Sequence, residues 1–474
     1  MPPNLLLIVF DTARADAFEP WGAVAGSTPA VADLASRGTA FPFAVAPSNW
    51  TLPSHASMFS GLLPGALGLT SRTRMSLGPG KNTRPLLEER ADRVLAEVLR
   101  RRGYSTRGVS ANPFIAPMNG FATGFDELRG VRGVARRKPG GDLRSRAAWM
   151  MEAWRATGDD GAAEAEDIVA RWLSEHDGRP FFWFVNLMEC HSPYLPPRPY
   201  NNLSGLQRLR AARDAHRFLT HASIYRVIVG ELDVPDDALE RMRQLYASAV
   251  RQMDDWVARI LDRLAATGML DDTVVVFTSD HGENLGENHL IGHSMSMDDR
   301  LIHVPLVVAG PDRPAAQGIV SLAELPKILA PLLGIEDHPW VEEIRPGGFA
   351  ASQAAGEFWI PVRNEAMQQW GLPEEAVLRV ESPITSVTDG RFKLVRDVEG
   401  ERAYDLAADR LEEKPLDLGG SMPDVPLNQM RAALDAVEAM APAELAEPDA
   451  LGGERPSDEE AAQLEERMRE LGYL

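Results

Sequence analysis

The chain has 474 residues and a formal charge of −20, with 44% hydrophobic and 25% charged residues. A chain of this length buries a large core and is expected to form two domains, one large and one small. Its acidic balance argues against nucleic acid and against a membrane as partners, because both attract basic surfaces. Any anionic ligand must therefore be captured by local positive charge, such as a metal ion or a His and Arg cluster.

The single cysteine, Cys190, excludes an intramolecular disulfide. The apolar run at residues 5–10 is too short for a signal peptide, and Asp11 interrupts it. No stretch approaches the roughly 20 apolar residues of a membrane span. We therefore expect a protein of the cytoplasm.

Three short apolar runs are typical of buried parallel strands: residues 5–10, 181–187 and 273–278. Helical patterns lie between them, at residues 87–102 and 242–267. Strands that alternate with helices predict an α/β fold with a mostly parallel sheet flanked by helices. The ligand site of such a sheet lies beyond the carboxyl ends of its strands.

Polar residues that can bind a metal follow each of these three runs. Asp11 ends the first run, His191 follows the second, and Asp280 with His281 ends the third. Each of them alone has a simple alternative role as a capping residue. Together they predict a site at one edge of the sheet.

The sequence changes in character beyond about residue 345. Residues 384–388 and 391–395 predict a hairpin with an Asp-Gly turn. Residues 441–457 are rich in Pro, Ala, Glu and Gly, as in a surface linker, and residues 458–471 have helical spacing. We therefore expect a catalytic α/β domain and a smaller α+β subdomain with a terminal helix, which span residues 1–345 and 346–474.

A basic segment spans residues 129–146, with seven basic residues and one acidic residue, Asp142. Most such runs are solvated loops. The alternative is a mobile lid over an anionic substrate.

The most informative segment is residues 48–61. Pro53, near the start of an apolar-periodic stretch, marks the N-terminus of a helix. The hydroxyl of Thr51 would then meet unpaired backbone N–H groups and the positive end of the helix dipole, which stabilise an anionic group. The simpler interpretation is that Thr51 only caps the helix.

This segment is similar to the sulfatase signature, in which Cys-x-Pro-Ser-Arg carries the cysteine that is oxidised to formylglycine. Here Thr51 stands in place of the cysteine and His55 in place of the arginine. Further stretches resemble the sulfatase and alkaline phosphatase superfamily, in the same order along nearly the whole chain: residues 4–16, 278–283, 293, 301–306, 320–334, 390–394 and 403–406. The resemblance implies an alkaline-phosphatase-like α/β fold with a smaller C-terminal antiparallel sheet and a helix.

The resemblance also implies one divalent metal ion, held by Asp11, Thr51, Asp280 and His281. Carboxylate and imidazole ligands together admit Mn²⁺ or Zn²⁺, whereas Mg²⁺ and Ca²⁺ prefer oxygen ligands, and the family often uses Ca²⁺. The chain departs from the family in having Asp11-Thr12 where sulfatases usually have an Asp-Asp pair. No convincing third ligand for a second ion is found beside His191 and His293.

Three histidines and one amide are further candidates for the site. His191 and His293 are expected to bind substrate oxygens or to protonate the leaving group. Asn112 is expected to supply a neutral donor where sulfatases have a lysine. His55, one helical turn beyond Thr51, is expected to orient the oxygen of Thr51.

These residues predict a metal-dependent hydrolase of phosphoric, phosphonic or sulfuric esters that forms a covalent intermediate on Thr51. Phosphorus is favoured over sulfur because threonine lacks the second hydroxyl of formylglycine. One alternative is a transferase that passes a phosphoryl or sulfo group to an acceptor other than water. Another is a non-catalytic relative that only binds a small anionic ester. The sequence does not predict the oligomeric state or the substrate. Residues 129–146 and 195–235 are expected to select the substrate.

Overall fold

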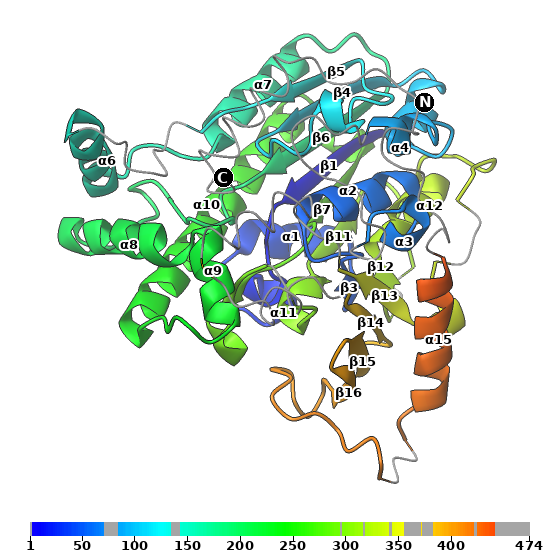
Figure 1. The fold of residues 1–474 in the computed structure, drawn as a ribbon. Helices are drawn as coiled ribbons and strands as arrows, with labels where there is room; N and C mark the ends of the chain where they lie inside the picture. Colours follow the sequence, from blue (N-terminus) through cyan, green and yellow to red (C-terminus); the bar gives the residue numbers. More distant parts are fainter. Residues whose placement is uncertain are drawn as a thin grey trace.

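In the computed structural model of the chain, the three apolar runs form neighbouring strands of a seven-stranded sheet (Figure 1). The strand order is β2-β11-β7-β1-β6-β4-β5. The strands are β1 (Asn4–Phe10), β2 (Thr39–Ala40), β4 (Ser105–Ser110), β5 (Glu127–Gly130), β6 (Phe181–Leu187), β7 (Thr273–Thr278) and β11 (Leu306–Ala309). The structure describes residues 2–70, 84–133, 143–293, 296–315, 318–340, 344–354, 371, 383–420 and 424–440.

The sheet is mostly parallel, as the sequence predicts. Strands β1, β4, β5, β6 and β7 pair in parallel, and β11 runs antiparallel to both of its neighbours. Leu7 of β1 lies beside Phe184 of β6 and Val276 of β7, and all three side chains are buried. Strands of this kind are apolar throughout because helices cover both faces of the sheet.

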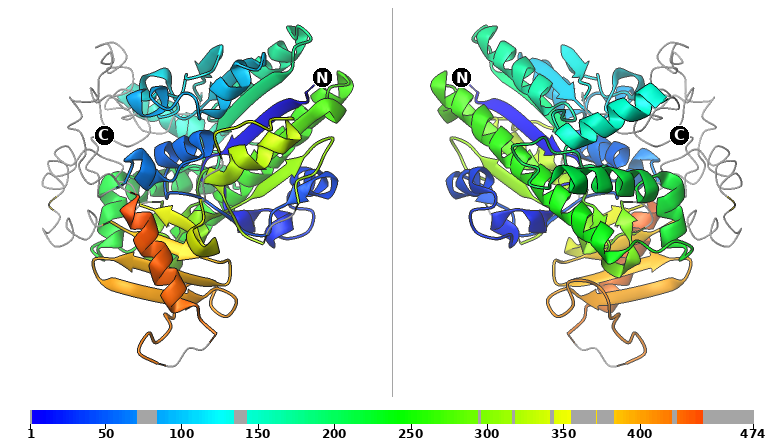
Figure 2. Two further views of the ribbon diagram at one scale, coloured as in Figure 1. Left: turned by 90° about the vertical axis from the view of Figure 1, so that its right-hand side faces the viewer. Right: turned by 90° about the vertical axis from the view of Figure 1, so that its left-hand side faces the viewer.

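Two groups of helices cover the sheet (Figures 1 and 2). One group consists of α1 (Pro29–Arg37), α7 (Ala162–Ser174) and α10 (Asp236–Ala266), and α10 packs against the other two. The second group consists of α2 (Thr51–Ser60), α5 (Leu95–Arg100) and α12 (Leu325–Leu332), and α2 packs against the other two. No helix in the described ranges has both the length and the apolar character needed to cross a membrane.

Of the two helices predicted from the sequence, one is confirmed and the other is wrong. The helix expected at residues 242–267 is the later part of α10, which begins after Pro235. The continuous helix expected at residues 87–102 is wrong, because α4 (Arg84–Glu88) and α5 are separate helices. The indole N–H of Trp340 donates to the backbone carbonyl of Arg93 over 2.8 Å, a long-range contact that local periodicity does not reveal.

The C-terminal part contains a four-stranded antiparallel sheet in the order β13-β14-β15-β16. The strands are β13 (Ala350–Gln353), β14 (Thr385–Thr388), β15 (Phe392–Asp397) and β16 (Gly400–Asp405). Helix α15 (Leu427–Ala439) lies against this sheet and buries Met430, Leu434 and Val437 (Figure 2). The hairpin expected around the Asp-Gly turn is thus confirmed as β14 and β15.

Several expectations for the same region remain open. The linker expected at residues 441–457 and the helix expected at 458–471 lie outside the described residues. The division into domains at residue 345 stays a prediction. Half of the proposed basic lid, residues 134–142, also lies outside the described residues, while Arg129 lies in β5 and residues 143–146 begin a helix rather than a loop.

Five further short strands form two small sheets, β10-β3-β12 and β8-β9. The short strands are β3 (Ala44–Val45), β8 (Asn284–Leu285), β9 (Ile291–Gly292), β10 (His303–Val304) and β12 (Val320–Ser321). The remaining helices are α3 (Pro64–Leu67), α6 (Leu143–Arg155), α8 (Gly205–Phe218), α9 (His221–Ile228) and α11 (Asp299–Ile302).

Candidate active site

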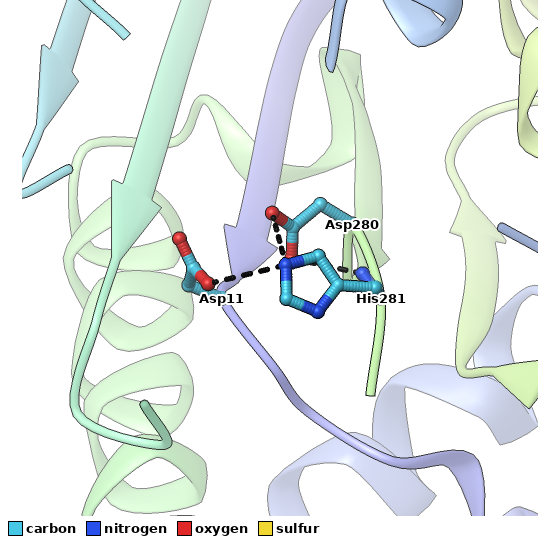
Figure 3. A group of neighbouring side chains, drawn as sticks. All are labelled: Asp11, Asp280 and His281. Atoms are coloured by element: carbon cyan, nitrogen blue, oxygen red, sulfur yellow. Dashed lines mark hydrogen bonds and ion pairs between the residues drawn. The ribbon is translucent and has the colours of Figure 1, made fainter. Parts of the chain in front are cut away.

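The carboxyl ends of β1 and β7 bring three predicted metal ligands together (Figure 3). Asp11 follows β1, and Asp280 and His281 follow β7, so that parallel pairing places the three side chains at one edge of the sheet. The Nε2 atom of His281 lies 3.8 Å from Oδ1 of Asp11 and 3.5 Å from Oδ2 of Asp280. All three residues are fully buried.

The atoms that face one another in this group lack hydrogen-bond partners. Within the described part of the chain, Oδ1 of Asp11, Oδ2 of Asp280 and Nε2 of His281 are buried and unsatisfied. Buried polar atoms of native proteins are nearly always paired, and a cation bound between these three atoms, which lie within 4.8 Å of one another, would satisfy all of them. Two carboxylates and one imidazole are a ligand set suited to a divalent ion.

The protonation of these residues is dominated by burial. Burial raises the pKa of Asp11 to about 6, although Asn112 and His293 oppose the change. Burial and then the charge of Asp11 raise the pKa of Asp280 well above its usual range. Burial, followed by the nearby His293, lowers the pKa of His281. A divalent cation would offset the cost of keeping both carboxylates ionised.

Backbone contacts hold these ligands in a fixed orientation. Oδ1 of Asp280 accepts the N–H groups of Thr12 (3.3 Å) and His281 (2.9 Å), which leaves Oδ2 for another partner. Nδ1 of His281 lies 3.0 Å from the carbonyl of Gly282. Donation to that carbonyl selects the tautomer with a lone pair on Nε2, as in many metal-bound histidines.

Thr12 occupies the position of the second Asp in the sulfatase pattern but turns away from the group. Its hydroxyl donates to the carbonyl of Cys190 over 2.6 Å. Its φ of 59° lies in the left-handed region, which is costly for a β-branched residue and is found mostly at functional sites. This side chain is therefore a support for the Cys190–His191 segment.

Thr51 is the first residue of α2, and Trp50 occupies the cap position. The interpretation of Thr51 as a helix cap is therefore wrong. Its hydroxyl lies 3.3 Å from Oδ2 of Asp11 and 3.1 Å from Nδ2 of Asn112. It can donate to the carboxylate while it accepts from the amide, and it lies beside the positive end of the helix dipole.

Asn112 follows β4 and links the nucleophile candidate to Asp11. Its Nδ2 donates to Oδ2 of Asp11 over 2.6 Å and to the hydroxyl of Thr51, while its Oδ1 accepts the N–H of Phe114 over 2.9 Å. The bond to Phe114 fixes the orientation of the amide. Asn112 thus lies at the site as expected, with its donor directed at Thr51.

His55 lies behind Thr51 rather than beside its hydroxyl. Its Nδ1 is 2.9 Å from the backbone carbonyl of Thr51 and 3.5 Å from Oδ2 of Asp280. Burial lowers its pKa to about 4, so His55 is neutral at physiological pH. The expected contact between His55 and the Thr51 side-chain oxygen is therefore replaced by a contact with the backbone.

The other two predicted histidines lie at the same site. The ring centroid of His293 is 4.7 Å from that of His281 and 5.0 Å from that of His191. His191 reaches the site from the loop after β6, where its Nδ1 lies 2.6 Å from the carbonyl of Ser192. Strands β1, β6 and β7 thus each deliver part of one cluster.

Glu283 is a member of this site that the sequence reasoning missed. It is fully buried, and its Oε1 lies 3.3 Å from Nδ1 of His293. Its position three residues after Asp280, within a stretch already assigned to metal binding, was the available signal. A carboxylate at this distance orients the imidazole.

Replacing Glu283 by glutamine is expected to lower kcat about 10- to 100-fold, the usual range for a residue that orients a site histidine. KM should change less than about threefold, because Glu283 does not face the Thr51 hydroxyl. Steady-state kinetics of Glu283→Gln would be compared with Glu287→Gln, whose carboxylate pairs with Arg14 instead. Equal activity of the two variants would contradict the role of Glu283.

Glu189, near His191, predicts a pH-dependent stability. Burial, followed by the charges of Asp160 and Asp159, raises its pKa from the usual 4.5 to about 8. The native state then binds a proton that the unfolded chain releases, so the stabilisation present below pH 4.5 is lost as the pH rises to about 8.

Denaturant unfolding measured across this window tests the effect. Glu189→Gln, which keeps an acceptor for the N–H of Ala162, should remove this part of the pH dependence. The matched variant Glu240→Gln, on the exposed face of α10, should retain the wild-type profile. A Glu189→Gln profile parallel to that of the wild type would contradict the prediction.

Several known proteins are similar in sequence to this chain. A family model described as Sulfatase matches residues 3–335. Choline-sulfatase of Rhizobium meliloti (strain 1021) is 27% identical over 447 residues, which cover 86% of this chain and 81% of that protein. The multifunctional alkaline phosphatase superfamily protein PehA of Trinickia caryophylli is 30% identical over 165 residues, 31% of this chain and 32% of PehA.

Solved structures show the same fold. The phosphonate monoester hydrolase of Agrobacterium radiobacter has a TM-score of 0.62 at 20% identity, and the match covers 93% of this chain and 96% of that one. The 2-O GAG sulfatase BT1596 has a TM-score of 0.64 at 17% identity, and the match covers 96% of this chain and 97% of that one. At these identities the likeness establishes the α/β architecture and its small C-terminal sheet.

Proposed function

The chain belongs to the sulfatase family, and from that premise we propose a metal-dependent ester hydrolase with Thr51 as its nucleophile. The family and its structural relatives are ester hydrolases of the alkaline phosphatase superfamily, and this class of activity holds for the chain. The nucleophile, the dependence on metal and the choice of a phosphoric, phosphonic or sulfuric ester are the parts that we propose.

The position of the Thr51 hydroxyl carries this proposal. It is bonded to Asp11, which like Asp280 and His281 has one buried side-chain atom without a hydrogen-bond partner among the described residues. A structural threonine in the core would have its hydroxyl paired with backbone or solvent. Here the hydroxyl adjoins the candidate metal ligands and the N-terminus of α2, where negative charge is stabilised.

Asp11, Asp280, His281 and the Thr51 oxygen would hold one divalent ion, either Mn²⁺, Zn²⁺, Ca²⁺ or Mg²⁺. When bound, such an ion lowers the pKa of the nucleophilic hydroxyl and neutralises charge on the transferring group. Members of the sulfatase family typically bind a divalent metal ion.

The residues of the chain account for each proton and bond in the first step. The Thr51 oxygen attacks phosphorus as its hydroxyl proton passes to Oδ2 of Asp11, its hydrogen-bond acceptor. The bond between phosphorus and the ester oxygen breaks, and that oxygen leaves with the bonding pair. His293, oriented by Glu283, donates a proton to the leaving oxygen. Asn112 and His191 bind the oxygens of the transferring group.

The second step frees Thr51. Water attacks phosphorus and gives up a proton to His293, which became neutral in the first step. The bond between phosphorus and the Thr51 oxygen breaks, and that oxygen takes back the proton held by Oδ2 of Asp11. Formylglycine in its hydrated form has two hydroxyls, and the free one can expel sulfate that is bound to the other. Threonine has a single hydroxyl, so a sulfated Thr51 could not release sulfate in this way. In-line attack by water at phosphorus meets no such obstacle, which favours a phosphoric or phosphonic ester as the substrate.

A substrate panel tests the proposal. Purified protein would be assayed with an aryl phosphate monoester, a diester, a phosphonate ester and an aryl sulfate, each with chelator or with one of the four ions. Turnover of a phosphorus ester that the chelator abolishes and one ion restores is the expected result. Turnover of the sulfate alone would overturn the preference for phosphorus. Capture of the group only by an added alcohol would indicate a transferase, and metal binding without turnover would indicate a ligand-binding relative.

A further inference from the structure

A cavity of about 540 Å³ is lined both by the end of helix α9 and by the C-terminal sheet. Its walls come from the end of α9 with the loop that follows it, from the β8–β9 connection, from residues 296–298, and from strands β15 and β16. None of the proposed metal ligands lines this cavity. Its volume falls in the range of small-molecule sites.

Much of the wall is aliphatic. Ile228, Leu232, Leu290, Met297 and Val395 contribute to it from different segments of the chain. A ligand with an apolar body would bury these surfaces and gain free energy from their removal from water. A hydrated inorganic ion would leave them uncovered.

The charged part of the wall is acidic. Five carboxylates and a single guanidinium line the cavity, namely Asp233, Asp298, Asp397, Glu399, Glu412 and Arg402. The guanidinium of Arg402 is already paired with Asp397 and lies 3.4 Å from Glu399, and Asp298 is paired with Arg300. With Lys393 beside Glu412, the five carboxylates face three cationic side chains, which leaves an excess of negative charge. An anionic ligand would therefore face unfavourable charge in this cavity, whereas a cation would be attracted.

The most buried of these carboxylates lies among other acids. Glu412 is 7% exposed and lies 2.6 Å from Nζ of Lys393. Burial raises the pKa of Glu412 to about 7, Lys393 opposes the change, and Asp298 and Asp299 add to it. A positive charge in the cavity would relieve the repulsion between these carboxylates.

We propose that this cavity binds an organic cation with an aliphatic body, whose ammonium group lies among the carboxylates while its chain packs on the apolar wall. The cavity is built from residues outside the proposed catalytic set, so the inference does not depend on the chemistry of Thr51. Sufficient volume, an aliphatic lining and an excess of negative charge coincide in this one cavity.

Three six-carbon ligands with different head groups distinguish the contribution of charge to binding from that of apolar contact. Binding of hexylammonium, 1-hexanol and hexanoate to the full-length protein would be measured by calorimetry, with Mn²⁺ present to occupy the catalytic carboxylates. Hexylammonium should bind at least about tenfold more tightly than the alcohol, and hexanoate should show no binding. An alcohol or a carboxylate that binds as tightly as the ammonium would overturn the proposal.

Two double variants test whether the cation binds in this cavity. Asp233→Asn combined with Glu399→Gln removes two exposed carboxylates from the lining, so the fold should persist and hexylammonium should bind about tenfold more weakly. Asp271→Asn combined with Asp272→Asn makes the same charge change at exposed positions outside the lining and should leave the affinity unaltered. Equal affinities for the two double variants would place the cation elsewhere and overturn the proposal.

Discussion

Thr51→Ala is expected to lower kcat for the phosphorus ester by at least about 10³-fold, because the covalent step loses its nucleophile. The protein should still fold and still bind the divalent ion, since Asp11, Asp280 and His281 remain. The affinity for that ion should fall by no more than about tenfold, the usual cost of losing one weak contact. Steady-state kinetics and a metal titration of the same preparation measure both effects.

Two further substitutions of Thr51 distinguish the effect of its hydroxyl from that of its branched side-chain shape. Thr51→Ser keeps the hydroxyl and should retain activity within about tenfold of the wild type. Thr51→Val keeps the branched shape without the hydroxyl and should be as inactive as Thr51→Ala. Mass spectrometry of quenched wild-type protein should find the transferred group on the peptide that contains Thr51. Full metal-dependent activity of Thr51→Val would rule out the covalent mechanism.

Asp280→Asn is expected to abolish both the binding of the divalent ion and turnover, with a loss of at least about 10³-fold in kcat. The stabilisation of the protein by the divalent ion should also differ between the wild type and Asp280→Asn. In the wild type, an ion at 100 times its Kd should add about 2.7 kcal/mol to the free energy of unfolding. In Asp280→Asn this gain should vanish.

The metal-free forms should behave differently. Burial and the charge of Asp11 raise the pKa of Asp280, so its ionised form costs stability at pH 7 when no cation is bound. Asp280→Asn without metal should therefore be at least as stable as the metal-free wild type. Thermal unfolding with chelator and with each ion measures both effects.

Asp254→Asn provides a matched control for a buried aspartate. Asp254 accepts the N–H groups of Ala30 and Val31 at the start of α1 and is not one of the proposed metal ligands. This variant should be less stable than the wild type but should keep the full stabilisation by the ion. A normal response of Asp280→Asn to the ion would show that Asp280 is not a ligand.

The central strands of the sheet are predictable from the sequence. The three apolar runs at residues 5–10, 181–187 and 273–278 became β1, β6 and β7, because a strand buried on both faces needs apolar side chains at every position. Parallel pairing then brings the carboxyl ends of such strands to one edge. For that reason Asp11 and Asp280, 269 residues apart in sequence, were predictable neighbours.

Other features depended on contacts between distant segments. The break in the helix at residues 87–102 involves a hydrogen bond from Trp340, and the approach of Glu283 to His293 depends on the path of the β8–β9 segment. The cation cavity likewise needs α9 to lie beside the C-terminal sheet. Local periodicity contains no information about such contacts.

By itself, the sequence determined the strands of the sheet, the placement of Thr51 at the N-terminus of a helix and the chemical types of the ligands, because these follow from side chains close in sequence. The tertiary structure decided which atoms face one another. It turned the Thr12 hydroxyl to Cys190, directed His55 to the backbone of Thr51 and left one atom each of Asp11, Asp280 and His281 unpaired. These outcomes depend on how buried polar groups share a limited number of partners, which is settled only when the whole chain has packed.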